Sequence, residues 1–432
     1  MTSRPFALVA AAIATAAAPA PVAAEEAPAV TTSEWSEPRA PLDLQWHALA
    51  LPEYAIELAF TPVRVAVAVV ERYRVDKRVY DLLRNDAGTV KVTPKVKLSG
   101  GEGLGLGGVF TLKRLDASEM RLDTGGVYRL DGDYELTARL QRVLATLDGR
   151  LLELRVDREV DQNLPYYGIG NDAPDEETAI RDESIDMVAL LDLTGRGFPE
   201  ITGVVELGLR YNILENGTDP TAPGIVDAGL MPLPPGFGES IMFPRIDLSL
   251  RYDTRDNIGR PNRGYTAEAH ARYTQDVSGE DLSAAAGRLV LNGYVPVLPN
   301  ERVLNFYVGI AGAIAPGADD EIPFHELVTL GRKNGLRGYG RSRFRDDFGW
   351  WGGVEYRFPI WEYINSGVAL TPAVFFDVGR VGSRGAELVE FPLRYSYGLG
   401  LRAAHDTLLV FRLQLGRSSE GVQLDFSLGK EL

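Results

Sequence analysis

The sequence predicts an all-β membrane protein: a 16-stranded antiparallel transmembrane β-barrel with a short N-terminal helical segment. Three observations support this prediction. Apolar and polar residues alternate along many successive segments, the chain begins with the features of a secretion signal, and the connections between segments are short and long in turn. A barrel that crosses a membrane shows all three features.

The alternation is clearest near the C-terminus. Tyr395, Tyr397, Leu399 and Leu401 are separated by serine, two glycines and, after Leu401, Arg402. Side chains of a strand point to opposite faces with a period of two. One face of this segment is therefore apolar and the other is small or polar. Because similar segments follow one another through most of the chain, we expect a wall with lipid on one side and water on the other.

Residues 1–24 are predicted to be a signal peptide. Arg4 gives a charged start, residues 6–18 are apolar, and residues 21–24 end in small side chains suited to a signal peptidase. Residues 25–86 are expected to form a flexible lead-in and a short helical segment. The helix would begin at Thr61-Pro62, and a short strand over 63–69 is the alternative. Residues 87–432 are expected to form the barrel.

Sixteen strands are predicted in this last region, and an even number is typical of bacterial single-chain barrels. Their boundaries carry errors of about 2–4 residues. The predicted strands cover residues 88–98, 104–114, 119–129, 134–146, 150–161, 178–192, 200–213, 245–254, 264–275, 283–297, 302–315, 350–360, 368–380, 393–404, 408–417 and 421–430.

The connections between these strands agree with the count. If the first strand starts in the periplasm, the long connections 162–177, 214–244, 316–349 and 381–392 all fall on the outer side. Barrels of this class have short periplasmic turns and longer outer loops. Aromatic residues near strand ends are expected to form an interfacial girdle. These residues are Tyr252, Tyr265, Tyr273, Tyr294, Trp350 and Trp361.

Composition excludes several other classes. No stretch after the signal is apolar for the ~18 residues that a spanning helix needs. The chain has no cysteine, which excludes disulfides and thiolate metal sites, and its formal net charge of −15 argues against nucleic-acid binding. The four histidines lack metal-ligand spacing, and no nucleophile motif is present. We therefore expect no enzymatic activity, no cofactor and no metal.

Three motifs occur in a suggestive order. Arg251 to Asp256 leads to Pro261-Asn262-Arg263-Gly264-Tyr265, the segment 336–344 reads Leu-Arg-Gly-Tyr-Gly-Arg-Ser-Arg-Phe, and residues 375–379 read Phe-Phe-Asp-Val-Gly. A weaker fourth match is 166–171, Tyr-Tyr-Gly-Ile-Gly-Asn. Together they resemble the BamA/TamA-type bacterial surface antigen family of outer-membrane barrels, from about residue 88 to the C-terminus.

The resemblance implies that the sixth outer loop folds into the lumen and that its tip, Arg337, Gly338 and Tyr339, docks on the inner wall. The residues themselves give a separate argument. A guanidinium inside a lumen needs carboxylate partners, and the inward faces of two neighbouring strands offer Glu355 and Asp377. A solvated arginine with no fixed partner is the alternative reading.

The resemblance also implies a function: assisting the insertion or translocation of proteins, or of lipids, at the bacterial cell outer membrane. The first and last strands would then pair poorly and open laterally. Residues 25–86 show no POTRA-like pattern, which argues against a full assembly role like that of BamA, and the sequence leaves open whether a periplasmic partner protein supplies the missing role. The expected partners are outer-membrane lipids and unfolded outer-membrane protein clients, but not nucleic acid. A passive or loop-gated diffusion channel and a structural surface antigen remain alternatives.

Overall fold

The structure is a computed structural model. It describes residues 83, 85, 87–99, 103–114, 120–143, 152–193, 198, 200–218, 222–229, 232–298, 302–363, 368–405 and 408–428. The predicted signal peptide and helical segment lie outside the described residues, apart from Leu83 and Asn85. Among the described residues, no helix is long and apolar enough to cross a membrane.

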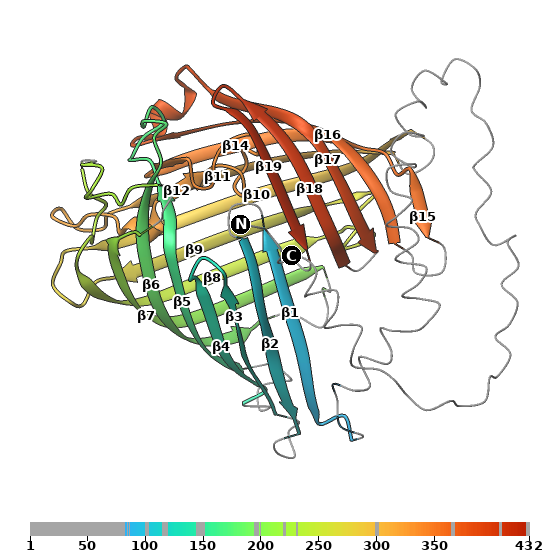
Figure 1. Cartoon of the computed structure of the whole chain (residues 1–432), viewed down its shortest axis with the longest axis horizontal. Coiled ribbons are helices and arrows are strands. Elements are labelled where there is room, and N and C mark those ends of the chain that lie inside the picture. The colour runs from blue at the N-terminus through green and yellow to red at the C-terminus, as the bar shows by residue number, and fades with distance from the viewer. Residues whose placement is uncertain are drawn as a thin grey trace, which may run out of the picture. The chain divides into compact units, whose positions relative to one another are not determined.

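All described strands except β12 and β13 form one antiparallel sheet that winds round in chain order (Figure 1). Its 17 strands include the three-residue β15, which pairs with β16 beyond the end of β14. Since β14 and β15 occupy one place in the wall, the wall has sixteen strands, and the predicted 16-stranded antiparallel barrel is confirmed. The wall strands are β1 (Val90–Ser99), β2 (Gly103–Lys113), β3 (Arg121–Arg129), β4 (Tyr134–Gln141), β5 (Leu152–Tyr166), β6 (Thr178–Asp192), β7 (Ile201–Asn216), β8 (Ser240–Asp253), β9 (Gly264–Gln275), β10 (Ser283–Leu298), β11 (Arg302–Ile314), β14 (Phe348–Arg357) with β15 (Trp361–Tyr363), β16 (Val368–Gly382), β17 (Arg394–His405), β18 (Leu408–Ser418) and β19 (Gly421–Leu428).

Two of the largest errors in the predicted boundaries lie at outer strand ends, and a third lies at the end of β4, which stops at Gln141 instead of residue 146. β5 continues to Tyr166 and β8 begins at Ser240, each about five residues beyond the prediction. Both strands keep pairing past the point where their apolar alternation stops, because the neighbouring strands β6 and β7 also extend there. Backbone pairing, rather than lipid contact, sets these ends.

The barrel closes through a narrow seam between β1 and β19. Ser99 lies opposite Ser427, and this is the single residue pair of the described β1–β19 register. By contrast, β1 and β2 pair continuously from Val90 opposite Leu112 to Ser99 opposite Gly103. The barrel is therefore nearly closed, and the short described register agrees with the poor pairing of the first and last strands that the resemblance implies.

The wall has an apolar outer face and a polar inner face. On β17, Tyr397 and Leu399 are exposed on the outside, while Ser396 is buried on the inside. On β16, Phe376 points outward and Asp377 inward. Strand ladders satisfy the backbone hydrogen bonds, so such a wall can cross a hydrocarbon layer.

The prediction that Tyr294 belongs to the aromatic girdle is wrong. Tyr294 pairs with Asn305, and the Arg357 guanidinium lies 5.4 Å from the centre of its ring. These neighbours belong to the inner face. On the same strand, Leu291 and Val295 are the residues that are exposed on the outer face. Tyr294 is placed inside because the strand's period of two puts odd-numbered residues on the lipid side here.

Three outer loops matter for the site. Loop 3 (167–177) joins β5 to β6, and loop 7 (383–393) joins β16 to β17 and contains the short helix η4 (Gly385–Val389). Loop 6 (315–347) joins β11 to β14. It contains the turn η3 (Phe324–Glu326) and the small hairpin β12 (Val328–Leu330) and β13 (Phe344–Asp346).

Candidate functional site: a loop docked inside the barrel

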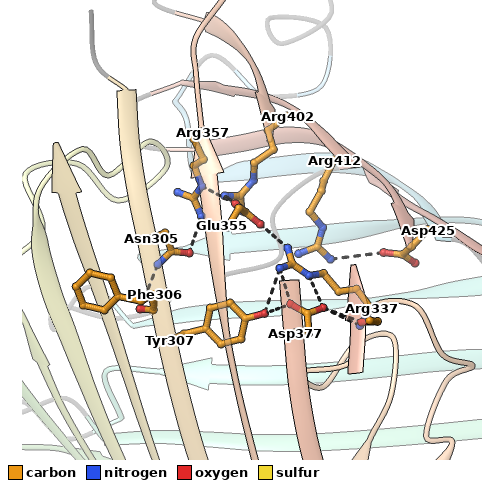
Figure 2. A network of polar contacts seen from close by, with 11 residues as sticks. Asn305, Phe306, Tyr307, Arg337, Glu355, Arg357, Asp377, Arg402, Arg412 and Asp425 are labelled. Atoms are coloured by element: carbon orange, nitrogen blue, oxygen red, sulfur yellow. Dashed lines mark hydrogen bonds and ion pairs between the residues drawn. The ribbon is translucent and has the colours of Figure 1, made fainter. Parts of the chain in front are cut away.

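Arg337, at the tip of loop 6, lies between the two carboxylates expected from the sequence (Figure 2). Its Nε and Nη2 donate to the two oxygens of Asp377 at 3.0 and 2.7 Å, and its Nη1 donates to Glu355. Its backbone N–H also donates to Asp377, at 3.1 Å. A planar fork of donors matches carboxylates in this way.

Aromatic side chains complete the surroundings of Arg337. Its guanidinium stacks 3.7 Å from the centre of the Phe375 ring, and its Nη2 donates to the Tyr307 hydroxyl at 3.1 Å. Burial opposes the positive charge, but the neighbouring Glu355 and Asp377 outweigh it and raise the pKa of Arg337. The arginine is therefore charged at every pH at which the protein folds.

Glu355 joins the tip to a larger network on the inner wall (Figure 2). Arg357 donates to its Oε1 at 2.6 Å, and Arg402 lies 3.6 Å from the same oxygen. Arg357 also donates to Asn305 at 3.2 Å. Three guanidiniums therefore surround this buried carboxylate and balance its negative charge. A charge that is removed from water needs such partners.

Gly338 lets the tip touch the wall backbone. A Cβ on this residue would lie 2.7 Å from both Arg417 and Ser396, and a Cβ on Gly416 would lie 2.7 Å from the Arg337 carbonyl oxygen. Facing glycines therefore allow two backbones to approach more closely than side chains would permit.

Tyr339 fills an apolar cluster inside the lumen. It is 1% exposed, and its ring meets Phe344 edge-on at 5.0 Å. Its hydroxyl lies 3.3 Å from that of Ser419. The cluster comprises Leu330, Leu336, Tyr339, Phe344, Trp351 and Val381. The tip is thus held by apolar packing as well as by charge.

A second anchor holds the beginning of loop 6. Glu326 accepts from the Thr274 hydroxyl at 3.0 Å and lies 3.4 Å from Arg272, which is itself bound to Asp247. The adjacent His325 packs edge-on against Phe243. Burial and nearby arginines hold the pKa of His325 well below its usual range, so this ring is neutral beside Glu326.

The end of loop 6 is tied to loop 3. Arg343 donates to Glu420 at 2.8 Å and to the Ala173 carbonyl at 2.9 Å. Arg345 stacks on the Phe324 ring at 3.7 Å, and its own carbonyl accepts from Gly170 at 2.7 Å. The 166–171 motif also contacts the 336–344 motif, because the Arg343 guanidinium lies 4.8 Å from the centre of the Tyr167 ring. Loop 6 and loop 3 cover the lumen together, and a cavity of about 280 Å³ remains between loop 6 and β9, β10 and β11.

The structure brings together all five residues named from the sequence. Four further residues were missed: Tyr307, Phe375, Ser396 and Glu326. Phe375 lies on β16 together with Asp377, whereas Tyr307 and Ser396 lie on β11 and β17, which pair with β14 and β16, so strand pairing was the signal that could have found them. No comparable signal could have found Glu326, because residues of a loop lack the alternation that assigns strand residues to one face.

Residues 244–431 match the Omp85 superfamily domain. No curated protein matches the chain. Among solved structures, BamA from Haemophilus ducreyi, in a form lacking POTRA domains 1–3, is 15% identical with a TM-score of 0.60. The match covers 79% of this chain and 70% of that one.

Two CdiB structures are also similar. CdiB from Acinetobacter baumannii is 14% identical with a TM-score of 0.45, covering 79% of this chain and 60% of that one. CdiB from Escherichia coli is 12% identical with a TM-score of 0.49, covering 78% and 62%. The chain thus spans less than two thirds of either CdiB.

The domain match, the likeness of fold and the apolar exterior agree with the resemblance inferred from the motifs. A closed or nearly closed barrel with an apolar outside is a structure of the bacterial outer membrane. The chain is therefore a bacterial outer-membrane β-barrel whose residues 244–431 match the Omp85 superfamily domain and whose fold is similar to that of BamA.

Proposed function

We propose that this protein assists the insertion or translocation of other proteins at the outer membrane, without enzymatic chemistry of its own. One observation carries the proposal: the barrel closes through a single described residue pair, Ser99 opposite Ser427. Every other wall junction is a longer ladder. Unpaired strand edges bind other strands readily, so a seam that opens offers a template to an incoming strand.

The docked loop 6 supports the same proposal. A lumen occupied by a loop that is fixed at Glu326, Arg337 and Arg343 leaves the lateral seam as the route between barrel and membrane. The partners we propose are outer-membrane lipids, unfolded barrel proteins as clients, and a periplasmic protein that delivers them. The superfamily match is consistent with such a role at the level of the family.

A disulfide across the seam tests the proposal. The chain has no cysteine of its own, and directly opposed residues of antiparallel strands lie at a separation that a disulfide can bridge. We expect oxidised Ser99→Cys/Ser427→Cys protein in vesicles to lose its ability to accelerate the insertion of an unfolded barrel protein. Reduction should restore it.

Ala286→Cys/Ala313→Cys is the matched control, because these residues are opposed within the full β10–β11 ladder. Oxidation of this pair should leave insertion unchanged. If the seam-locked protein inserts clients as fast when oxidised as when reduced, lateral opening is not the mechanism.

A further inference from the structure

Loop 7 packs on the lipid-facing surface of the barrel wall. This position is unexpected for a connection between two strands. The loop is held by Trp350 on β14 and Arg380 on β16, which lie opposite each other in the strand ladder. Their neighbours in chain, Trp351 and Val381, pack in the luminal cluster. Because side chains alternate along a strand, Trp350 and Arg380 point toward the membrane side.

The contacts of these two residues show where the loop is held. The Trp350 ring nitrogen donates to the Leu388 carbonyl at 2.8 Å. Arg380 donates to the carbonyls of Glu387 and Pro392 at 2.7 and 2.8 Å, and lies 3.7 Å from the Glu390 carboxylate. Loop 7 therefore folds over the outward face at the outer ends of β14 and β16 (Figure 1).

The burial of Arg380 supports this placement independently. An arginine on the outward face of a barrel is costly unless its donors are satisfied. Arg380 is 7% exposed, and loop 7 supplies carbonyls and a carboxylate to its guanidinium. Without the loop, the Arg380 guanidinium would face lipid headgroups and its five N–H donors would lose these partners in loop 7.

The free side of loop 7 is apolar. Phe391 is 83% exposed and Val389 is 79% exposed, whereas Leu388 between the loop and the wall is buried. Exposed apolar side chains that continue a lipid-facing surface mark a site of membrane contact. Here the wall beside the loop carries the outward pair Phe376 and Tyr395, whose rings stack at 6.4 Å.

We propose that loop 7 is an interfacial element that places Val389 and Phe391 among the lipids of the outer leaflet, beside β14 and β16. The ligand is the lipid surface itself. The wall residues Trp350 and Tyr395 lie at this level, and aromatic residues are enriched where headgroups meet acyl chains. A rigid apolar loop tip held there by Arg380 extends the lipid contact of this side of the barrel.

Spin labelling tests the proposal in the full-length mature protein, because a chain without cysteine accepts a label at a single introduced site. Phe391→Cys and Val389→Cys would each carry a nitroxide, in vesicles of phosphatidylethanolamine and phosphatidylglycerol. Collision rates with oxygen, which partitions into lipid, are compared with those of a water-soluble nickel chelate. We expect both labels to collide several-fold more with oxygen than with nickel.

Two other positions calibrate the measurement. Phe376→Cys on the outward face of β16 gives the value for lipid, and Ala386→Cys, exposed on η4 of the same loop, gives the value for water. Heat-modifiability on a gel shows that each labelled protein has folded. If the labels at 389 and 391 behave like the label at 386, bilayer lipid does not cover the loop tip and the proposal is overturned. Such a result would leave the tip free for a protein partner.

Discussion

At the scale of single residues, Arg337 determines how loop 6 is fixed. It bridges Asp377 and Glu355, which lie on two neighbouring wall strands, and it does so from a loop that belongs to neither. The wall would hold two buried carboxylates beside each other if the arginine were absent. A charge that loses its partner in such a site destabilises the fold far more than an exposed charge does.

We therefore expect Arg337→Ala to lower the free energy of unfolding by about 3–5 kcal/mol. The midpoint of urea unfolding and the protease resistance of loop 6 measure this effect. Arg337→Lys should lie between wild type and alanine, because an ammonium keeps the charge but cannot fork across two carboxylates.

Arg263→Ala is the control for that experiment. Arg263 is 78% exposed and lies 3.9 Å from Asp256, so its loss should cost at most about 1 kcal/mol. Equal urea midpoints for the Arg337 and Arg263 variants would show that the luminal contacts do not stabilise the protein.

Asp346, on the loop hairpin, gives a pH dependence. Burial, together with the nearby carboxylates of Asp347 and Glu387, raises its pKa to about 6 from the ordinary 3.8. The folded loop therefore binds a proton more tightly than the open loop does. Between pH 3.8 and 6 the stability of the docked loop should fall as pH rises, and above pH 6 the full penalty of about 2–3 kcal/mol remains.

Asp346→Asn should remove that penalty, because asparagine keeps the oxygen that accepts from the Asp347 N–H. We expect protease resistance of loop 6 to increase at pH 7.5 in this variant and to be nearly unchanged at pH 4. Asp319→Asn, at an exposed position of the same loop, is the control. A variant loop that is no more resistant than wild type at pH 7.5 would contradict the assignment.

At the scale of elements, loop 6 is held inside the barrel by arginines along its whole second half. Arg332, Arg341 and Arg343 lie within 3.6 Å of Asp425, Asp161 and Glu420. These carboxylates come from the wall and its outer turn. Acidic side chains of the wall thus receive the arginines in the second half of loop 6.

Removal of residues 316–346, replaced by a short Gly-Ser linker, should therefore raise single-channel conductance several-fold in planar bilayers. The lumen would lose both the loop and the apolar cluster around Tyr339. Arg337→Ala keeps the loop but holds it less firmly. It should therefore give brief channel openings whose conductance lies between that of the wild type and that of the deletion variant. Conductance that stays at the wild-type level after the deletion would mean that loop 6 does not restrict the lumen.

At the scale of the whole barrel, the seam between β1 and β19 distinguishes this wall from a uniform cylinder. Ladder pairing is continuous from β1 to β19 in chain order, and it is nearly lost only where the ends of the sheet meet. A barrel needs closure to hide its edges from lipid. A seam this narrow therefore combines the stability of fifteen full junctions with one edge that can be exposed.

Much of the architecture was readable from the sequence. Strand alternation fixed which residues face lipid, and the number of alternating segments predicted sixteen strands, because both follow from a local period of two. The same period placed Glu355 and Asp377 on the inner face, within reach of a loop arginine. The girdle prediction for Tyr294 was wrong because it used position near a strand end and not the period of two, and the ends of β4, β5 and β8 were wrong because backbone pairing does not stop where the apolar alternation stops.

The sequence by itself therefore determined the wall: its strand number, its two faces and the charges that line it. Only the tertiary structure decided how the loops are held and how they contact one another. The Glu326 anchor and the docking of loop 3 on loop 6 join residues far apart in the chain, and so does the hydrogen bond from Trp350 to loop 7. No local period encodes such contacts, because they depend on how the ends of the sheet and its loops meet in three dimensions.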